Sequence, residues 1–169
     1  LNLGATHPCR HVCFQNIVEL YGECVVSAEH TVGYIHRAFE KIAEHRPLYQ
    51  ITPLTDRMNY CSSPINNMGW HICCERLLKV KTPKRVDYLR IIIMELARIS
   101  DHLLCNSIVG VDSGAYTGLL YVMQYRELIY EIYEEICGSR LTTNIGRVGG
   151  FERNFTTTSF ERLENFIKD

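Results

Sequence analysis

The spacing of apolar residues changes along the chain, from short apolar runs near its start to a helical spacing beyond residue 33. Apolar residues at 17–20 and 24–26 flank Tyr21-Gly22-Glu23, which is typical of a β-hairpin with glycine in its turn. From there on, apolar residues recur three and four positions apart, as in amphipathic helices. We therefore expect an α+β fold: a small antiparallel sheet in residues 1–32, followed by a bundle of mainly long helices over residues 33–169.

Three long segments carry the clearest helical patterns, about 56–80, 82–103 and 117–137. In the first, the predicted apolar face consists of Trp70, Cys73, Cys74, Leu77 and Leu78. Thr82-Pro83 suits an N-cap followed by a first helical position, and Gly138 suits the end of the third helix. The third helix has a predicted apolar stripe, made of Tyr121, Tyr125, Leu128 and Ile132.

Shorter elements join and follow these helices. A short helix is expected from Ile35 to Arg46, because Pro47 would stop it, and a last helix should begin at the capping box Thr158-x-x-Glu161. Gly110, Gly114 and Gly118 recur every four residues, which predicts a break between helices or a close backbone approach.

Composition limits the classes of protein to which the chain can belong. Its 169 residues suit one domain, and 46% hydrophobic with 22% charged residues is typical of a folded core. A net charge of −1 gives no general attraction to nucleic acid or to anionic membranes. Leu1 is not an initiator methionine, and the helical pattern after Thr158 stops at Asp169 without an end signal. We expect a single partial domain, truncated at its C-terminus.

Cysteine and histidine are the residues that first suggest a metal. The eight cysteines include no Cys-x-x-Cys pair, so free thiols are the simplest interpretation. The motif His7-x-Cys9-x-His11-x-Cys13 places four ligand types on one face of a strand. Those positions would span roughly 20 Å, whereas zinc–ligand bonds are about 2 Å long. We therefore predict a strand or hairpin here, and no metal site in the chain.

A polar stretch from Thr55 to Asn67 precedes the first long helical pattern. Arg57 and Tyr60 are three residues apart and would share one face of a helix, where both could donate hydrogen bonds to an oxygen-bearing ligand. The competing interpretation is an ordinary helix start, with Thr55 and Asp56 as capping residues. On local pattern alone we favour the capped helix.

Five motifs change that preference because they occur in one order. They are Leu3-Gly4-Ala5-Thr6-His7-Pro8, Gly33-Tyr34-Ile35-His36-Arg37-x-x-Glu40-Lys41, Thr55-Asp56-Arg57-Met58-Asn59-Tyr60, Val111-Asp112-x-Gly114-Ala115-x-Thr117 and Gly146-Arg147-x-Gly149-Gly150. Together they closely resemble the D subunit of proton-pumping NADH:quinone oxidoreductase, respiratory complex I. That family is related to the large subunit of nickel–iron hydrogenases. The resemblance covers nearly the whole chain, which would be an N-terminal fragment of less than half the subunit.

The resemblance implies a hydrogenase large-subunit-like fold and a role inside an enzyme complex. The D and B subunits form the cavity where quinone is reduced, coupled to proton translocation, and the C subunit is a further partner. The iron–sulfur cluster that gives up the electrons belongs to the neighbouring B subunit, and NADH is oxidised elsewhere in the complex. The implied location is peripheral, on the cytoplasmic face of the bacterial inner membrane, with membrane contact only through the complex. The isolated fragment is expected to be inactive.

The same resemblance assigns roles to five residues. His11 and Tyr60 match the residues that hold the quinone headgroup, and Asp112 matches the carboxylate paired with that histidine. Arg37 and Arg57 match arginines near the terminal iron–sulfur cluster. A quinone that gains two electrons builds negative charge on two oxygens, so a phenol and a carboxylate-oriented histidine are suitable donors. We accordingly expect His11, Tyr60 and Asp112 to be the catalytic residues, with quinone bound by His11 and Tyr60.

The chain departs from the family pattern at three positions. Val12 stands where most relatives have glycine. Loss of that glycine would stiffen the hairpin that carries His11, and Arg10 adds a charge beside His11. Thr142 occupies the place of a histidine linked to proton-coupled cluster reduction, so that role is not carried over.

Three alternatives remain open from the sequence. A hydrogenase-like metal enzyme would require Arg-x-Cys-x-x-Cys, but Asn59 and Ser62 follow Arg57 where the cysteines would stand. A related membrane-bound oxidoreductase using ferredoxin or another donor is not excluded by the sequence, because the donor binds elsewhere. The third alternative is a non-catalytic scaffold, which Val12 and the truncation keep open for the isolated fragment.

Overall fold

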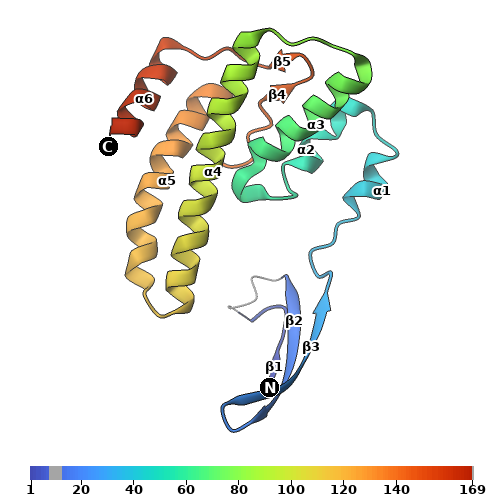
Figure 1. The fold of residues 1–169 in the computed structure, drawn as a ribbon, viewed down its shortest axis with the longest axis vertical. Helices are drawn as coiled ribbons and strands as arrows, with labels where there is room; N and C mark the ends of the chain where they lie inside the picture. The colour runs from blue at the N-terminus through green and yellow to red at the C-terminus, as the bar shows by residue number, and fades with distance from the viewer. Residues whose placement is uncertain (8–12, 169) are drawn as a thin grey trace. The chain divides into compact units, whose positions relative to one another are not determined.

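The computed structural model describes residues 1–7 and 13–168. The chain divides into two compact units, residues 1–44 and 45–169, and each is described by itself. A small antiparallel sheet at the start and several long helices after it confirm the expected α+β class (Figure 1). The prediction of a single partial domain stays a prediction.

The first unit is a three-stranded antiparallel sheet followed by one short helix. Its strands lie in the order β1–β2–β3, and their bounds are Asn2–Leu3 for β1, Phe14–Tyr21 for β2 and Cys24–Val32 for β3. The predicted hairpin is confirmed, with Gly22 in its turn at a φ of 61° that glycine adopts without strain. The predicted helix over 35–46 is shorter: α1 spans Phe39–Ala43, because Ala38 before it is left-handed (φ 51°).

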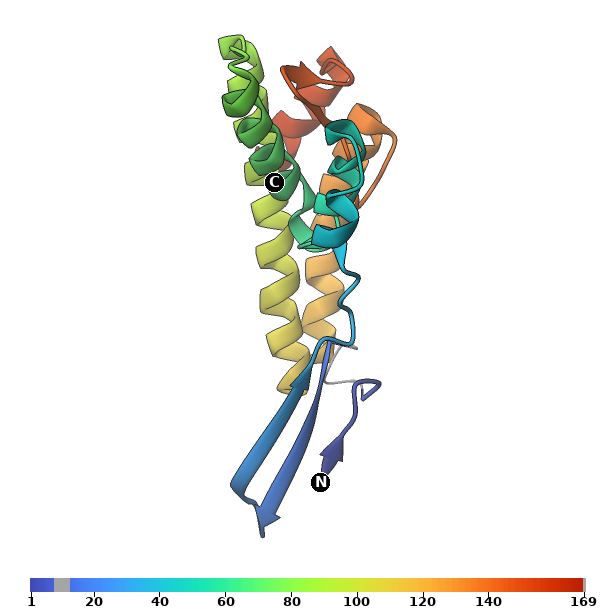
Figure 2. The ribbon, with the colours of Figure 1, turned by 90° about the vertical axis from the view of Figure 1, so that its right-hand side faces the viewer.

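The second unit is built from four longer helices and short connecting elements. These are η2 (Leu48–Gln50), α2 (Thr52–Thr55), η3 (Tyr60–Ser62), α3 (Ser63–Leu78), α4 (Lys84–Asp112), α5 (Tyr116–Cys137), β4 (Gly146–Arg147), β5 (Gly150–Phe151) and α6 (Thr157–Lys168). Helices α4 and α5 run antiparallel and side by side; α3 packs against α4, and α6 against α5 (Figures 1 and 2). None of the helices in the described residues is long and apolar enough to cross a membrane.

The hydrophobic core of this unit lies between the helices and the segment that joins α5 to α6. It contains Met68, Leu89, Ile93, Leu96, Ile129, Ile132, Tyr133, Ile136, Ile145 and Phe155. Branched aliphatic side chains from α4 and α5 supply most of it, spaced so that each helix keeps one face against the other. The predicted break between these helices is confirmed, since α4 ends at Asp112 and Gly114 turns the chain at a φ of 89°.

The predicted helix over 56–80 is wrong in its first third. α2 ends at Thr55, residues 57–59 are not helical, and Asn59 is extended at φ −125° and ψ 92°. A 3₁₀ turn then leads into α3, which begins at Ser63 with Pro64 inside its first turn. Proline lacks an N–H and is accommodated only there in a regular helix, so the helix starts where the proline allows.

The predicted apolar face of α3 is also wrong, except at Cys74, which is buried. Leu77 and Leu78 are exposed (74% and 53%), Cys73 is exposed, and Trp70 is only partly buried. The buried side of the helix instead carries Asn67, His71 and Glu75 beside Met68 and Cys74. These polar groups can be buried because each has a hydrogen-bond partner on another segment, as described below.

Smaller corrections concern helix ends and one stripe. The N-cap of α4 is Pro83, whereas Thr82 donates its hydroxyl to Asp87 Oδ1 at 2.8 Å. α6 spans Thr157–Lys168, and its cap lies two positions before the predicted Thr158: the Thr156 Oγ1 atom accepts from the Ser159 amide at 3.1 Å. On α5 the bounds are confirmed within one residue, but Tyr121 and Tyr125 are exposed.

Candidate functional site

Arg57 and Tyr60 lie on the short irregular segment that links α2 to α3. The Arg57 side chain is 49% exposed and Tyr60 is 54% exposed, so both present polar groups to the outside of the helical unit. They do not share a helix face, which corrects the sequence prediction, because residues 57–59 are not helical.

Hydrogen bonds from Asn59 fix this segment. The Asn59 Nδ2 atom donates to Ser62 Oγ at 2.7 Å and to Asp101 Oδ2, on α4, at 3.0 Å. The Asn59 carbonyl accepts from Asn66 Nδ2 at 3.3 Å. Tyr60 therefore follows a residue that is tied to both α3 and α4, so its backbone is held although its side chain is exposed.

A buried polar network lies directly behind Arg57. The Asp56 side chain is only 1% exposed, and its Oδ1 atom accepts from Asn67 Nδ2 at 2.5 Å. The orientation of the Asn67 amide is set by Thr55, whose hydroxyl donates to Asn67 Oδ1 at 2.8 Å. Burial raises the pKa of the Asp56 carboxyl, while the Asn67 hydrogen bond and the Arg57 charge act in the opposite direction.

His71 is a second buried titratable group on α3. Its Nε2 atom lies 3.1 Å from Thr52 Oγ1, and among the described residues its Nδ1 atom has no hydrogen-bond partner. Gly146 packs so closely that a Cβ atom there would lie 2.5 Å from His71 Nδ1, so only glycine fits. Burial, reinforced by the nearby Arg90 charge, lowers the pKa of His71 to about 4.

The depressed pKa of His71 predicts a pH-dependent loss of stability. Between pH 6.5 and about 4 the unfolded chain binds a proton at this histidine and the folded chain does not. The contribution of neutral, buried His71 to the free energy of unfolding is therefore fully present above pH 6.5. It is lost as the pH falls toward 4, by about 3 kcal/mol in all. We expect the difference in urea midpoint between pH 7 and pH 4.5 to be smaller in His71→Gln than in the parent chain. His102→Gln, at an exposed position of α4, is the control; an unchanged difference in His71→Gln would contradict the assignment.

Glu75 and Arg90 form a buried ion pair between α3 and α4. Two hydrogen bonds join them, from Arg90 Nη1 to Glu75 Oε2 at 2.8 Å and from Nη2 to Oε1 at 2.5 Å. The pair also holds the β4–β5 turn, because Glu75 Oε1 accepts from the Gly149 amide at 2.7 Å and Arg90 Nη2 donates to the Arg147 carbonyl at 3.2 Å. The hydrogen bonds from Arg90 lower the pKa of Glu75, so the carboxylate stays charged despite burial.

The other residues that the sequence predicts for the site are taken one by one. Asp112 is the exposed last residue of α4, and the described residues show no hydrogen bond or ion pair between it and Arg57 or Tyr60. Arg37 is exposed in the first unit. His11 lies outside the described residues, as do Arg10 and Val12. Thr142 offers its carbonyl to Ser139 Oγ at 2.7 Å.

Sequence reasoning missed the network behind Arg57. Asp56 was interpreted as a possible cap, and Asn67, His71 and Glu75 were not singled out. Their spacing was the available signal, since polar residues four positions apart form a stripe along one helix face. A polar stripe opposite exposed leucines indicates that the helix faces polar partners inside the fold.

No cluster for a metal ion is present in the part of the chain that the structure describes. There, no group of three histidine, cysteine or acidic side chains is arranged to hold an ion. The cysteines described are free thiols: Cys13, Cys24, Cys61, Cys73, Cys74, Cys105 and Cys137.

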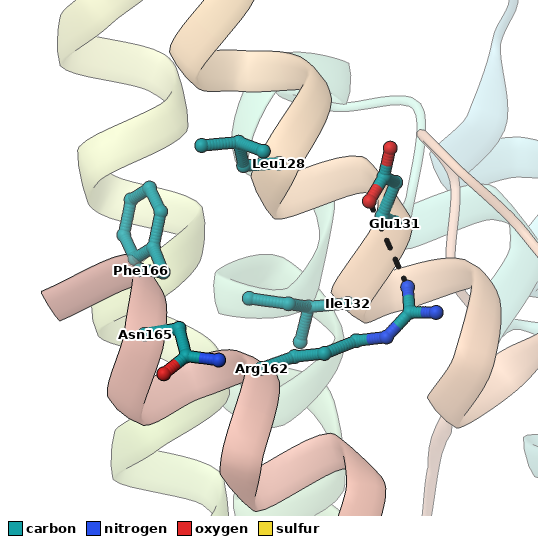
Figure 3. Close-up of a pocket in the computed structure, with 6 residues that line it drawn as sticks. All are labelled: Leu128, Glu131, Ile132, Arg162, Asn165 and Phe166. Carbon is teal, nitrogen blue, oxygen red and sulfur yellow. Dashed lines mark ion pairs between the residues drawn. The ribbon is translucent and has the colours of Figure 1, made fainter. Parts of the chain in front are cut away.

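A small hollow of about 130 Å³ lies between α5 and α6, and its lining residues are far from Arg57 in the sequence. Leu128 and Ile132 of α5 and Phe166 of α6 supply its apolar lining, and Glu131 forms an ion pair with Arg162 at its edge, 3.7 Å apart (Figure 3). Asn165 of α6 completes the lining, and the small volume with its largely apolar walls is typical of helix packing.

Comparison with known proteins identifies relatives over the whole chain. A family model described as the 49 kDa subunit of respiratory-chain NADH dehydrogenase matches residues 112–169. A protein from Flavobacterium johnsoniae, named as the D subunit of NADH-quinone oxidoreductase, is 68% identical over all 169 residues, and one from Cytophaga hutchinsonii, named as a second D subunit, is 64% identical. A protein from Bdellovibrio bacteriovorus, named as the C/D subunit, is 38% identical over the full chain. The chain spans 41%, 43% and 30% of these three relatives, respectively.

Proposed function

The chain belongs to the family of the 49 kDa subunit of respiratory-chain NADH dehydrogenase, also named the D subunit of NADH-quinone oxidoreductase, and from that premise we propose that it supplies the quinone site of such an oxidoreductase. One structural observation supports the proposal most. An exposed phenol and an exposed guanidinium stand three residues apart on a segment that hydrogen bonds hold to both α3 and α4.

The chemistry of quinone reduction matches these groups. Reduction to quinol adds two electrons and two protons, and negative charge builds on the two carbonyl oxygens before the protons arrive. The Tyr60 hydroxyl can donate a hydrogen bond through its phenolic O–H. We assign it one carbonyl oxygen, and we assign the other to His11, oriented by Asp112. A donor aimed at developing charge in a water-poor site lowers the barrier more than one in open water.

Membership of this family also suggests an electron source and partners. We propose that an iron–sulfur cluster in the neighbouring B subunit supplies the electrons, with Arg37 and Arg57 of this chain near it, and that NADH is oxidised elsewhere in the complex. An exposed cation such as Arg57 suits that place, since it stabilises negative charge on a neighbouring group. The B and C subunits are the proposed partners, on the cytoplasmic face of the bacterial inner membrane. We further propose that quinone reduction is coupled to proton translocation, and that the chain alone is inactive.

Photoaffinity labelling of the assembled oxidoreductase tests the proposal. The probe is a quinone that carries a photoreactive group on its ring, with and without an excess of ordinary quinone. We expect competitor-sensitive label in the peptide that contains Arg57 and Tyr60. Two results would contradict a quinone site on this chain. One is an amount of label in the chain that does not fall when ordinary quinone is added, and the other is competitor-sensitive label confined to other subunits.

A further inference from the structure

Asp56 is a buried carboxyl group to which the proposed function gives no role. Its Oδ1 atom accepts one hydrogen bond from Asn67, but its Oδ2 atom is buried without a hydrogen-bond partner among the described residues. Burying a carboxylate oxygen without a donor is unfavourable unless a nearby charge compensates it. The compensating charge here is Arg57, whose Nη1 atom lies 3.8 Å from Asp56 Oδ2.

The same nitrogen atom of the guanidinium has a second partner. Arg57 Nη1 donates to the Pro53 carbonyl at 2.8 Å, one turn back along the chain. Arg57 therefore spans from the buried Asp56 carboxyl to the outside of the unit, where half of its side chain is exposed. Because Asn67 and Thr55 lock the Asp56 carboxyl group, its unpartnered oxygen is held toward the arginine.

We propose that Asp56 is the positioning residue for Arg57: its buried, ionised carboxylate helps to hold the guanidinium in place at the quinone site, and protonation of Asp56 removes that electrostatic attraction. This inference rests on the proposed function, since it concerns the same site. Asp56 acts through Arg57 and touches no substrate itself.

The surroundings of Asp56 make its protonation state responsive to pH. Arg57 is the charged group on its own segment, and the Cys137 thiol at the end of α5 is the titratable group that feels its charge. The neutral Asn67 and Ser63 side chains of α3 and the Asn144 backbone after α5 favour the charged carboxylate, and so act on the pKa of Asp56 in the direction opposite to burial. Burial raises the pKa of Asp56, so a proton binds it at a higher pH than it binds an exposed aspartate.

The test compares Asp56→Asn with the parent in the assembled oxidoreductase. Asparagine keeps the size of the side chain and an oxygen for Asn67, but places an amide donor where Oδ2 faced Arg57. We expect kcat/KM for quinone to fall about fivefold, the size of a partly exposed ion pair, with electron transfer from NADH to an artificial acceptor unchanged. The parent should also lose quinone activity as the pH falls through the pKa of Asp56, and Asp56→Asn should lack that limb of the profile.

Two further variants separate positioning from a structural role. In an Arg57→Gln background, Asp56→Asn should have no additional effect on quinone kinetics, because its action passes through the arginine. Arg57→Gln alone should also remove the acidic limb, which keeps the inference testable if Asp56→Asn does not assemble. Asp87→Asn, at an exposed position of α4, is the control for loss of one acidic charge.

The outcomes distinguish this inference from the proposed function. Additive effects of Asp56→Asn and Arg57→Gln, or an acidic limb that persists in Arg57→Gln, would overturn the positioning role. If Tyr60→Phe lowers quinone activity while both of these variants behave like the parent, the quinone site stands and the role of Asp56 is wrong. If the photoaffinity label also avoids this chain, the proposed function itself fails.

Discussion

Glu75→Ala is expected to destabilise the helical unit by about 3–5 kcal/mol, because it leaves the buried Arg90 guanidinium without its carboxylate. It also removes the acceptor for the Gly149 amide, so the β4–β5 turn loses its tie to α3. The measurement is the free energy of unfolding in urea at pH 7. Because the pKa of Glu75 is lowered in the fold, its contribution is present above the unfolded pKa and is lost as the pH falls through the folded one.

Glu95→Ala is the matched control for this prediction. Glu95 also pairs with an arginine, Arg98 at 3.0 Å, but both side chains are 54% exposed. Exposed pairs of this kind contribute up to about 1 kcal/mol, so the control should be close to the parent. Replacing both members of the buried pair, as Glu75→Leu with Arg90→Met, should recover most of the lost stability because no buried charge remains. Equal effects of Glu75→Ala and Glu95→Ala would contradict the account of this pair.

The parts of the fold that sequence predicted are those decided by local chemistry. The hairpin around Gly22, the break at Gly114 and the end of α5 at Gly138 all depend on a positive φ that glycine adopts at little cost. The local sequence is enough to predict such turns, since the glycine lies within the turn that requires it.

The buried face of α3 could not be predicted in the same way. Hydrophobic periodicity placed Leu77 and Leu78 inside, whereas Asn67, His71 and Glu75 are buried. Burial of those polar groups depends on partners elsewhere in the chain, namely Thr55, Thr52 and Arg90. Without those partners the local pattern favours the leucines, because an unpaired polar group is costly to bury.

The candidate site shows the same division. Arg57 and Tyr60 were identified from their motif, and the structure places both on one exposed segment. The expected helix beneath them was wrong because Pro64 delays the start of α3. Asp56 was missed as a buried group, since an aspartate before a helical pattern ordinarily caps it. The predicted pairing of His11 with Asp112 stays a prediction.

Tyr60→Phe is expected to lower quinone turnover in the assembled oxidoreductase by roughly a hundredfold. The change removes one hydroxyl and keeps the ring, which is 54% exposed, so packing should barely alter. A hydrogen-bond donor to charge that develops in the transition state contributes about 3 kcal/mol, which corresponds to that loss of rate. Tyr49→Phe, at a position of the same unit that is 75% exposed, is the matched control and should be silent.

The most direct test of the proposed quinone site is the ratio of two rates measured on one preparation of Tyr60→Phe. The first is electron transfer from NADH to quinone, and the second is transfer from NADH to an artificial acceptor that takes electrons before the quinone site. We predict that the ratio falls roughly a hundredfold relative to the parent, because only the first rate needs the Tyr60 hydroxyl. A ratio equal to that of the parent and of Tyr49→Phe, with unchanged quinone affinity, would contradict the headgroup role of Tyr60.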